Sequence, residues 1–397
     1  MVWLLTLLSC THAPPTAPSV LLVLIDGLRA DRVGVYGHLP SETPMIDTIA
    51  ADGTVFTRAY STSTDPAAAR ASIMSGYVPP QHGVRAGNQA HPIQLGGWIK
   101  QLGRAGWKVS KHDVSDIEKD SFELNKVVTK SGYMAVLSGE VSLPEGSRKI
   151  TSRSYDQAVR SLDSTLGLAM SEWRRSNPEG WLVIAGVTGS LVGARPEARV
   201  VVTDDLIRVP LIIQGPGVER GWEVADVVST VDVGSTIMAS LGMPFDGPGG
   251  VLMNGGVEYA YHESVLAHEW FNARPLVGYT GTDGRYIQGV HDRWYPAMDD
   301  SVWAVEDSES EYPEARQRLE ALRALYGVNK GLDPEVWTLE VDAAETVGWV
   351  SLAVKIRGAL ASGNPAAARR MFERLEKGAP QAKIVEKIRL EIGESSP

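Results

Sequence analysis

The chain has 397 residues, a formal net charge of −10 and one cysteine, and 43% of its residues are apolar. The length accommodates one large α/β domain and a smaller one, and the apolar share is that of a globular protein. The negative charge is spread along the chain without a basic stripe, which argues against a nucleic-acid partner, and a single cysteine excludes a disulfide framework.

The first 18 residues resemble a targeting segment followed by a tether. The opening MVWLLTLLSC is apolar and resembles a bacterial lipobox, which is cleaved before a lipidated cysteine, here Cys10. Its apolar core is short and no Lys or Arg precedes it, so an ordinary signal peptide or a misassigned start remains an alternative. Residues 11–18 are rich in Pro and Ala and would form a short tether. We expect a protein of the bacterial cell envelope, lipid-anchored through Cys10 or else periplasmic or secreted. No apolar run is long enough to span a bilayer, so any link to the membrane would be the lipid.

Residues 20–25 predict a strand buried on both faces, because they form an unbroken apolar run with β-branched residues. This strand delivers Asp26 and Gly27 into a loop, where ligands gather in open α/β sheets. A helix over 45–51, a strand over 55–60 and a helix over 66–76 follow. Asp26 alone is a weak signal, since an Asp that ends a strand is often a turn former or a helix cap.

Five sequence blocks in this order resemble the sulfatase family of the alkaline phosphatase superfamily. They are IDGLRAD at 25–31, TPMIDTIA at 43–50, GTVFTRAY at 53–60, RASIMSG at 70–76 and HGV at 82–84. The resemblance implies an α/β fold, a three-layer sandwich with a mostly parallel central sheet, a small C-terminal antiparallel sheet and a helical tail. We expect a signal and tether over 1–18, the sulfatase-like α/β domain over 19–245, the sheet subdomain over 246–326 and the helical tail over 327–397.

The block that carries the nucleophile in sulfatases departs from the family pattern. The family motif C-x-P-S-R, whose Cys becomes a formylglycine, falls on residues 66–70, so Pro66 occupies the nucleophile position and Arg70 is retained. Proline has no nucleophilic atom. A slipped alignment would offer Thr64 or Asp65 instead.

The metal site implied by the resemblance has also lost ligands. The family motif S-D-H-G or S-D-N-G falls on residues 186–189, which places Val187 and Thr188 at the ligand positions, and Gly27 replaces a second Asp. A Ca²⁺ or Mg²⁺ ion needs about six oxygen ligands, several of them charged, and Asp26 is the one charged ligand left. We therefore expect no bound cofactor and predict that loop N–H groups or Arg70 stabilise the Asp26 carboxylate.

A Lys–His pair follows near the position of the family motif G-K-W-H. Lys111 and His112 arrive about three residues early, so we treat them, with Arg70, as remnants of a sulfate-binding set. No element is predicted over 115–149, where the family supplies a further His; the chain has no His between His112 and His262.

The family pattern resumes with a helix over 155–176, on which Asp163 is expected to be a surface or capping charge. Strands over 181–187 and 208–213, a helix over 231–242 and an antiparallel sheet from 259 follow. His262, Glu263 and His268 are the clustered metal-type side chains that remain, and one face of a strand could present both histidines. Hydrogen bonding at the surface or between the domains is favoured over a metal site.

The tail from 333 to 393 is predicted to be mostly helical. After Asn364 and Pro365, a helix places Met371, Phe372 and Leu375 on one face. Packing back onto the domain is favoured over a repeat unit that docks a partner.

Two functions from different classes remain open. One is an active sulfuric or phosphoric ester hydrolase that uses Ca²⁺ or Mg²⁺ and a non-standard nucleophile. The other is a degenerate relative, a lipid-anchored binding or scaffolding protein whose former cleft or helical tail contacts a protein or a glycan. The losses fall at the nucleophile and metal positions while the packing motifs remain, which favours the second function.

Overall fold

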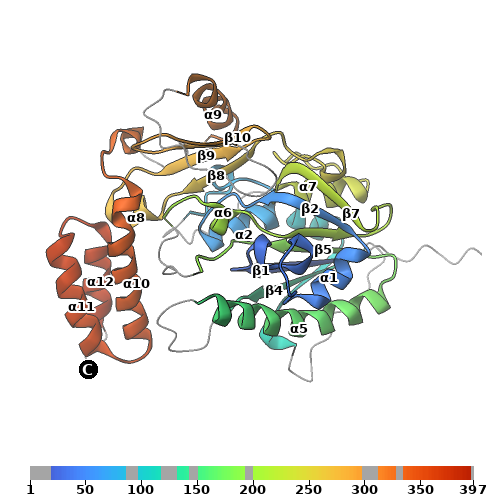
Figure 1. Cartoon of the computed structure of the whole chain (residues 1–397), viewed down its shortest axis with the longest axis horizontal. Helices are drawn as coiled ribbons and strands as arrows, with labels where there is room; N and C mark the ends of the chain where they lie inside the picture. The colour runs from blue at the N-terminus through green and yellow to red at the C-terminus, as the bar shows by residue number, and fades with distance from the viewer. Residues whose placement is uncertain are drawn as a thin grey trace, which may run out of the picture.

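The computed structural model of the chain describes residues 19–85, 97–117, 132–142, 151–192, 200–296, 312–327 and 334–394. Its main sheet has seven strands in the order β3-β4-β1-β5-β6-β2-β7, parallel except for β6 (Figure 1). The strands are β1 (Ser19–Asp26), β2 (Thr54–Tyr60), β3 (Lys108–Asp113), β4 (Tyr133–Glu140), β5 (Trp181–Gly186), β6 (Leu211–Gln214) and β7 (Trp222–Ser229).

Helices cover both faces of this sheet, which makes a three-layer α/β sandwich. Strand β1 lies inside the sheet between β4 and β5, and alternate residues of β1 enter the two apolar cores, with Val23 in one and Leu22 in the other. The first core includes α1 (Pro44–Ala51) and α5 (Ser152–Ser176). The second includes α2 (Pro66–Ser75), α4 (Trp98–Arg104) and α7 (Asp232–Ser240). The expected fold class is thus confirmed.

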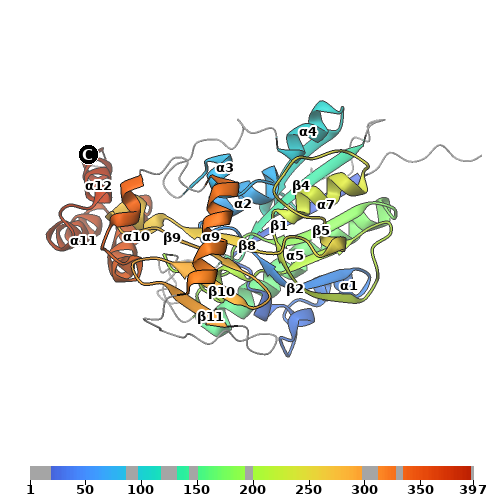
Figure 2. The same cartoon turned by 90° about the horizontal axis from the view of Figure 1, so that it is seen from above.

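A second, antiparallel sheet has the order β11-β10-β9-β8. One of its faces packs on α9 (Pro313–Tyr326) through Tyr261, Tyr279 and Tyr286. Figure 2 shows α9 lying across this sheet, and Figure 1 shows it on the side of the sheet that faces away from the main sandwich. The strands are β8 (Ala260–Ser264), β9 (Leu276–Thr280), β10 (Gly284–Gln288) and β11 (Arg293–Pro296), and two short helices are α3 (Pro79–His82) and α6 (Asp204–Ile207).

The chain ends in three helices, α10 (Val347–Ala361), α11 (Pro365–Gly378) and α12 (Lys383–Glu394). They share an apolar core with α8 (Leu266–Phe271), and the helix after Asn364 buries Phe372 and Leu375 there while Met371 is half-buried. The guanidinium of Arg357 lies 5.4 Å from the ring centroid of Trp270. The helical tail therefore packs back onto the preceding subdomain. Every helix in the described ranges is too short or too polar to cross a bilayer.

Two strands depart from the sequence expectations. No element was predicted over 115–149, but β4 lies there and pairs with β1 along its whole length. Strand β7 forms the sheet edge beside β2 and was also not predicted. Strand β3 begins at Lys108 and carries Lys111 and His112.

Candidate functional site

Asp26 ends β1 at the carboxyl edge of the sheet, where we expected the functional site. Its side chain is 7% exposed. One carboxylate oxygen, Oδ1, accepts the hydroxyl proton of Thr188 at 2.6 Å and the backbone N–H of Gly27 at 2.9 Å. Gly27 has a φ of +76°, in the left-handed region where any side chain strains the backbone. The loop after β1 and the loop after β5 are therefore joined by a direct hydrogen bond between side chains.

Thr188, rather than Arg70, is the side-chain partner of Asp26. Arg70 and Asp26 both lie in the described ranges, and no hydrogen bond or ion pair joins their side chains there. The predicted pairing with Arg70 is thus replaced by Thr188, whereas the predicted support from a loop N–H group is confirmed at Gly27. Arg70 lies half-buried on α2.

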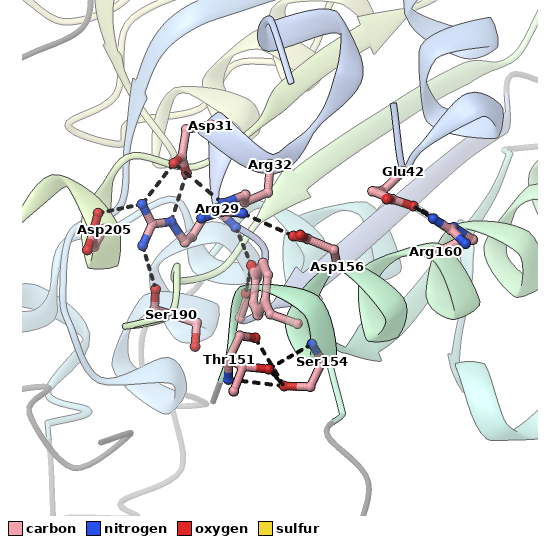
Figure 3. A network of polar contacts seen from close by, with 12 residues as sticks. Arg29, Asp31, Arg32, Glu42, Thr151, Ser154, Asp156, Arg160, Ser190 and Asp205 are labelled. Carbon is pink, nitrogen blue, oxygen red and sulfur yellow. Dashed lines mark hydrogen bonds and ion pairs between the residues drawn. The ribbon is translucent and has the colours of Figure 1, made fainter. Parts of the chain in front are cut away.

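A second set of contacts fixes the same two loops around Arg29 (Figure 3). The Arg29 guanidinium donates to both oxygens of Asp31 at 2.8 Å, pairs with Asp205 at 2.7 Å and donates to the backbone carbonyl of Ser190 at 3.3 Å. Burial opposes its charge, but the hydrogen bond and charge of Asp31 raise the pKa of Arg29. This arginine ties the loop after β1 to the loop after β5 and to α6.

Tyr155, on α5, makes hydrogen bonds to the backbone of the loop after β1. Its hydroxyl accepts the backbone N–H of Arg29 at 3.0 Å and donates to the backbone carbonyl of Gly27 at 2.5 Å. Burial raises the pKa of this phenol, so it stays protonated and able to donate. The loop that follows Asp26 is therefore held by protein groups alone.

The side chains at this position do not fit a divalent cation. Asp26 is the one carboxylate among the positions implied by the family motif, Val187 has no ligand atom, and the Thr188 hydroxyl donates its proton to Asp26. Ca²⁺ and Mg²⁺ need about six oxygen ligands with several charges among them. In the ranges that the structure describes, no group of three or more His, Cys, Asp or Glu side chains is arranged to hold a metal.

The nucleophile position lies at the first turn of α2. Pro66 is the first residue of that helix, and Asp65 caps it by accepting the N–H of Ala68 at 2.9 Å. The Thr64 side chain is 1% exposed, and its hydroxyl donates to Ser264 at 2.9 Å. Asp65, one alternative to Pro66, therefore caps α2, and Thr64, the other, makes a hydrogen bond between the two sheets.

A buried Ser72–His82 pair lies nearby and was not predicted from the sequence. His82 Nδ1 accepts the backbone N–H of Val84 at 3.1 Å, so the ring proton is on Nε2, which donates to the Ser72 hydroxyl at 2.9 Å. Burial, with the charge of Arg85, lowers the pKa of His82 to about 3. Because the imidazole donates to the serine, it does not activate Ser72 as a nucleophile.

Lys111 and His112 lie on the edge strand β3, with β4 between them and β1. Lys111 is level with Val136 and hence with Leu22, four residues before Asp26 on β1, which is about 13 Å along the strand direction. Lys111 is exposed, and His112 contacts the Ser110 hydroxyl at 2.9 Å. The structure therefore does not bring these two residues to Asp26. Cys10 lies outside the described residues.

His262, Glu263 and His268 do not form a cluster. His262 Nδ1 donates to the backbone carbonyl of Ser61 at 2.7 Å, and its Nε2 accepts from the Thr280 hydroxyl at 2.7 Å. His268 lies on α8 instead of the strand and contacts the Ala273 carbonyl at 3.1 Å. His262 therefore bonds across the two sheets, as the favoured alternative expected, and one strand does not present both imidazoles.

Comparisons with known proteins agree with this architecture. Residues 18–123 match the family described as Sulfatase. Over 116 residues the chain is 31% identical to the N-acetylgalactosamine-6-sulfatase of Rattus norvegicus, covering 29% of this chain and 22% of that protein. The chain thus spans less than a quarter of the length of that relative.

Two solved structures resemble the whole sandwich. A phosphonate monoester hydrolase of Agrobacterium radiobacter has a TM-score of 0.59 at 15% identity, over 78% of this chain and 96% of that one. A protein of the alkaline phosphatase superfamily from Vibrio parahaemolyticus has a TM-score of 0.57 at 16% identity, over 79% and 88%. At such low sequence identity, these two similarities show a shared fold alone.

Proposed function

We propose that this chain is a catalytically inactive member of the sulfatase family, a proposal supported by the family match over residues 18–123. We place it at the bacterial cell envelope, anchored by a lipid on Cys10, in a binding or scaffolding role. The observation that carries the proposal is the hydrogen bond from Thr188 to Asp26 at 2.6 Å. It gives Oδ1 of the Asp26 carboxylate a donor from the protein, at the place where the family motif implies metal ligands.

Ester cleavage in this fold would need a nucleophile and a cation that stabilises the developing charge. Pro66 supplies no nucleophile, and the carboxylate that remains is bonded to Thr188 and Gly27. The hydrogen bond from Thr188 to Oδ1 of Asp26 would compete with a cation for that oxygen, and a buried hydrogen bond to a charged group is worth about 1.5–3 kcal/mol. The ion would then find too few charged oxygens to offset its dehydration.

A partner would be recognised by surfaces that catalysis no longer constrains. We propose a protein or glycan that contacts the carboxyl edge of the main sheet or the helices α10–α12. The retention of Arg70 in its family block favours the alternative, an active sulfuric or phosphoric ester hydrolase, because a guanidinium suits an anionic ester.

One assay separates the two functions. The full chain carrying Cys10→Ser, purified without lipid, is incubated with Ca²⁺ or Mg²⁺, and turnover of aryl sulfate and aryl phosphate is measured together with bound metal. We expect no turnover above buffer and far less than one ion per chain. Turnover that Arg70→Ala abolishes and the exposed control Arg153→Ala leaves intact would establish the hydrolase, as would a stoichiometric ion.

A further inference from the structure

The main sheet has an edge opposite the candidate site, at which its parallel strands begin. The register of the strands makes Lys108, Tyr133, Ser19 and Trp181 neighbours there, and Thr54 is level with Trp222 at the far side. We call this surface the amino edge. It consists of the strand starts and the helix ends and turns beside them, that is, the first residue of β1 and residues 52–53, 104–108, 172–180 and 215–222. In Figure 1 the end of α5 marks it on the right, while α10–α12 lie at the left end of the long axis.

Trp222 is the large apolar side chain that this edge exposes. It begins β7 and is 52% exposed, although β7 buries its last three residues. Tryptophan is favoured at the boundary between lipid and water, where its ring contacts acyl chains and its N–H stays near the headgroups. A tryptophan exposed at the start of an edge strand is therefore suited to a lipid surface.

The charges of the amino edge differ from those of the whole molecule. The chain carries a net charge of −10, but the defined ranges of this edge hold five basic and four acidic side chains. An edge without the general negative excess is repelled least by the anionic surface of a bacterial membrane. The charged residues are Asp52, Arg104, Lys108, Glu172, Arg174, Arg175, Glu179, Glu219 and Arg220.

The chain reaches this edge from Cys10 over a short distance. Residues 11–18 separate Cys10 from Ser19, where β1 begins, and fully extended they span at most about 30 Å. Pro14, Pro15 and Pro18 restrict this segment further. A lipid on Cys10 would thus keep the start of β1 close to the bilayer.

We propose that the amino edge is the surface by which the anchored protein meets the lipid, with Trp222 and the turn over 215–221 at the interface. This inference rests on the proposed lipidation of Cys10. The carboxyl edge with Asp26 and Thr188, and the helices α10–α12, then face away from the membrane, where they are accessible to a partner.

The single cysteine makes this orientation measurable. The full chain is produced with its lipid, which occupies the Cys10 thiol, so a second cysteine can be labelled with one fluorophore. Three exposed positions carry it in separate variants: Arg220→Cys at the amino edge, Glu140→Cys level with Asp26, and Lys377→Cys on α11. Each is reconstituted into vesicles of equal parts phosphatidylethanolamine and phosphatidylglycerol containing a nitroxide-labelled lipid.

We expect the nitroxide to quench the label at 220 several-fold more than the labels at 140 and 377. Adding Trp222→Ala should reduce quenching at 220, whereas Leu168→Ala, which alters a 69% exposed leucine on α5, should not. Equal quenching at all three positions, or stronger quenching at 140, would overturn the orientation while leaving the lipoprotein intact. Mass spectrometry that finds no lipid on Cys10 would instead remove the anchor, and this inference with it.

Discussion

At the scale of single residues, the hydroxyl proton of Thr188 decides the chemistry beside Asp26, because it makes Thr188 a hydrogen-bond donor to the carboxylate. A carboxylate or imidazole at that place would offer electron pairs to a cation, whereas the threonine hydroxyl donates to Asp26 at 2.6 Å. A buried carboxylate that is left unpaired is costly, so the loss of a cation would require such a donor. The same hydrogen bond therefore stabilises the fold and occupies one oxygen of Asp26 with a protein donor.

We predict that Thr188→Val lowers the free energy of unfolding by about 1–3 kcal/mol, because it leaves a buried carboxylate without its side-chain donor. Urea unfolding measures the change. The matched control is Thr230→Val: both threonines are 0% exposed, and the Thr230 hydroxyl has no hydrogen-bond partner among the described residues. Equal losses in the two variants would mean that the bond to Asp26 contributes nothing.

Two buried histidines make stability depend on pH. Burial, with nearby arginine charges, lowers the pKa of His82 and of His262 to about 3, from an ordinary value of 6.5. Between these values the unfolded chain binds the proton and the folded chain does not, so stability is fully present above pH 6.5 and is lost as pH falls. Each histidine should contribute roughly 1.4 kcal/mol per pH unit in this window.

Urea unfolding at pH 6.5 and at about pH 4.5 tests this dependence. We expect His262→Gln to reduce the slope of the unfolding free energy against pH by an amount that corresponds to about one proton, since glutamine does not titrate. The control is His291→Gln, which changes an exposed imidazole. A slope that His262→Gln does not alter would show that His262 is protonated in the folded chain.

At the scale of elements, α1 begins with a cap from another helix. Thr43 precedes α1 but makes no side-chain cap to it. Instead Asp163, which is 1% exposed on α5, accepts the N–H groups of Met45 at 3.0 Å and Ile46 at 2.9 Å. The predicted capping charge is therefore confirmed, but the helix it caps lies more than a hundred residues earlier in the chain.

We predict that Asp163→Ala lowers the free energy of unfolding by about 2 kcal/mol, since it leaves the buried N–H of Ile46 and the partly buried N–H of Met45 without their acceptor. Asp163→Asn retains one side-chain oxygen and should recover part of the loss. Denaturant unfolding gives both values, and hydrogen exchange at Met45 and Ile46 reports the helix start. Unchanged exchange at those amides in Asp163→Ala would contradict the cap.

Local patterns predicted most elements but missed two strands for physical reasons. Strand β1 is an apolar run between clear breakers, and α2 begins at a Pro and ends before a Gly, so both are visible in the sequence. Strand β4 ends in the polar residues Ser138 and Glu140, and β7 exposes most of its first five residues as an edge strand, which obscures the apolar period.

The site was predictable to the extent that it follows linear motifs. Pro66 and Asp26 lie at the helix start and strand end that the motifs predicted. The partner of Asp26 was not predictable, because Thr188 is 162 residues away and its proton direction depends on the fold. The same holds for Lys111, which a motif places near the site but which the strand order places two strands from β1.

At the scale of the whole molecule, the two sheets are joined by a buried ion pair. Arg85 follows α3 in the main sandwich, and Glu263 lies on β8 in the second sheet, with 5% and 0% of their side chains exposed. Two hydrogen bonds of 2.8 and 3.0 Å connect them, and the Tyr261 hydroxyl donates to the same carboxylate at 2.7 Å. Both charges depend on the contact between the sheets to remain buried.

We predict that Glu263→Gln lowers the free energy of unfolding by about 3–5 kcal/mol, because the buried Arg85 guanidinium then loses the negative charge of Glu263. Adding Arg85→Met should recover part of this loss by removing the buried charge. The control is Glu376→Gln, which breaks the exposed Arg389–Glu376 pair, 49% and 43% exposed, and should cost less than about 1 kcal/mol. If the two glutamine variants lose the same stability in thermal unfolding, water reaches the buried pair, and the sheets are held together by their apolar contacts alone.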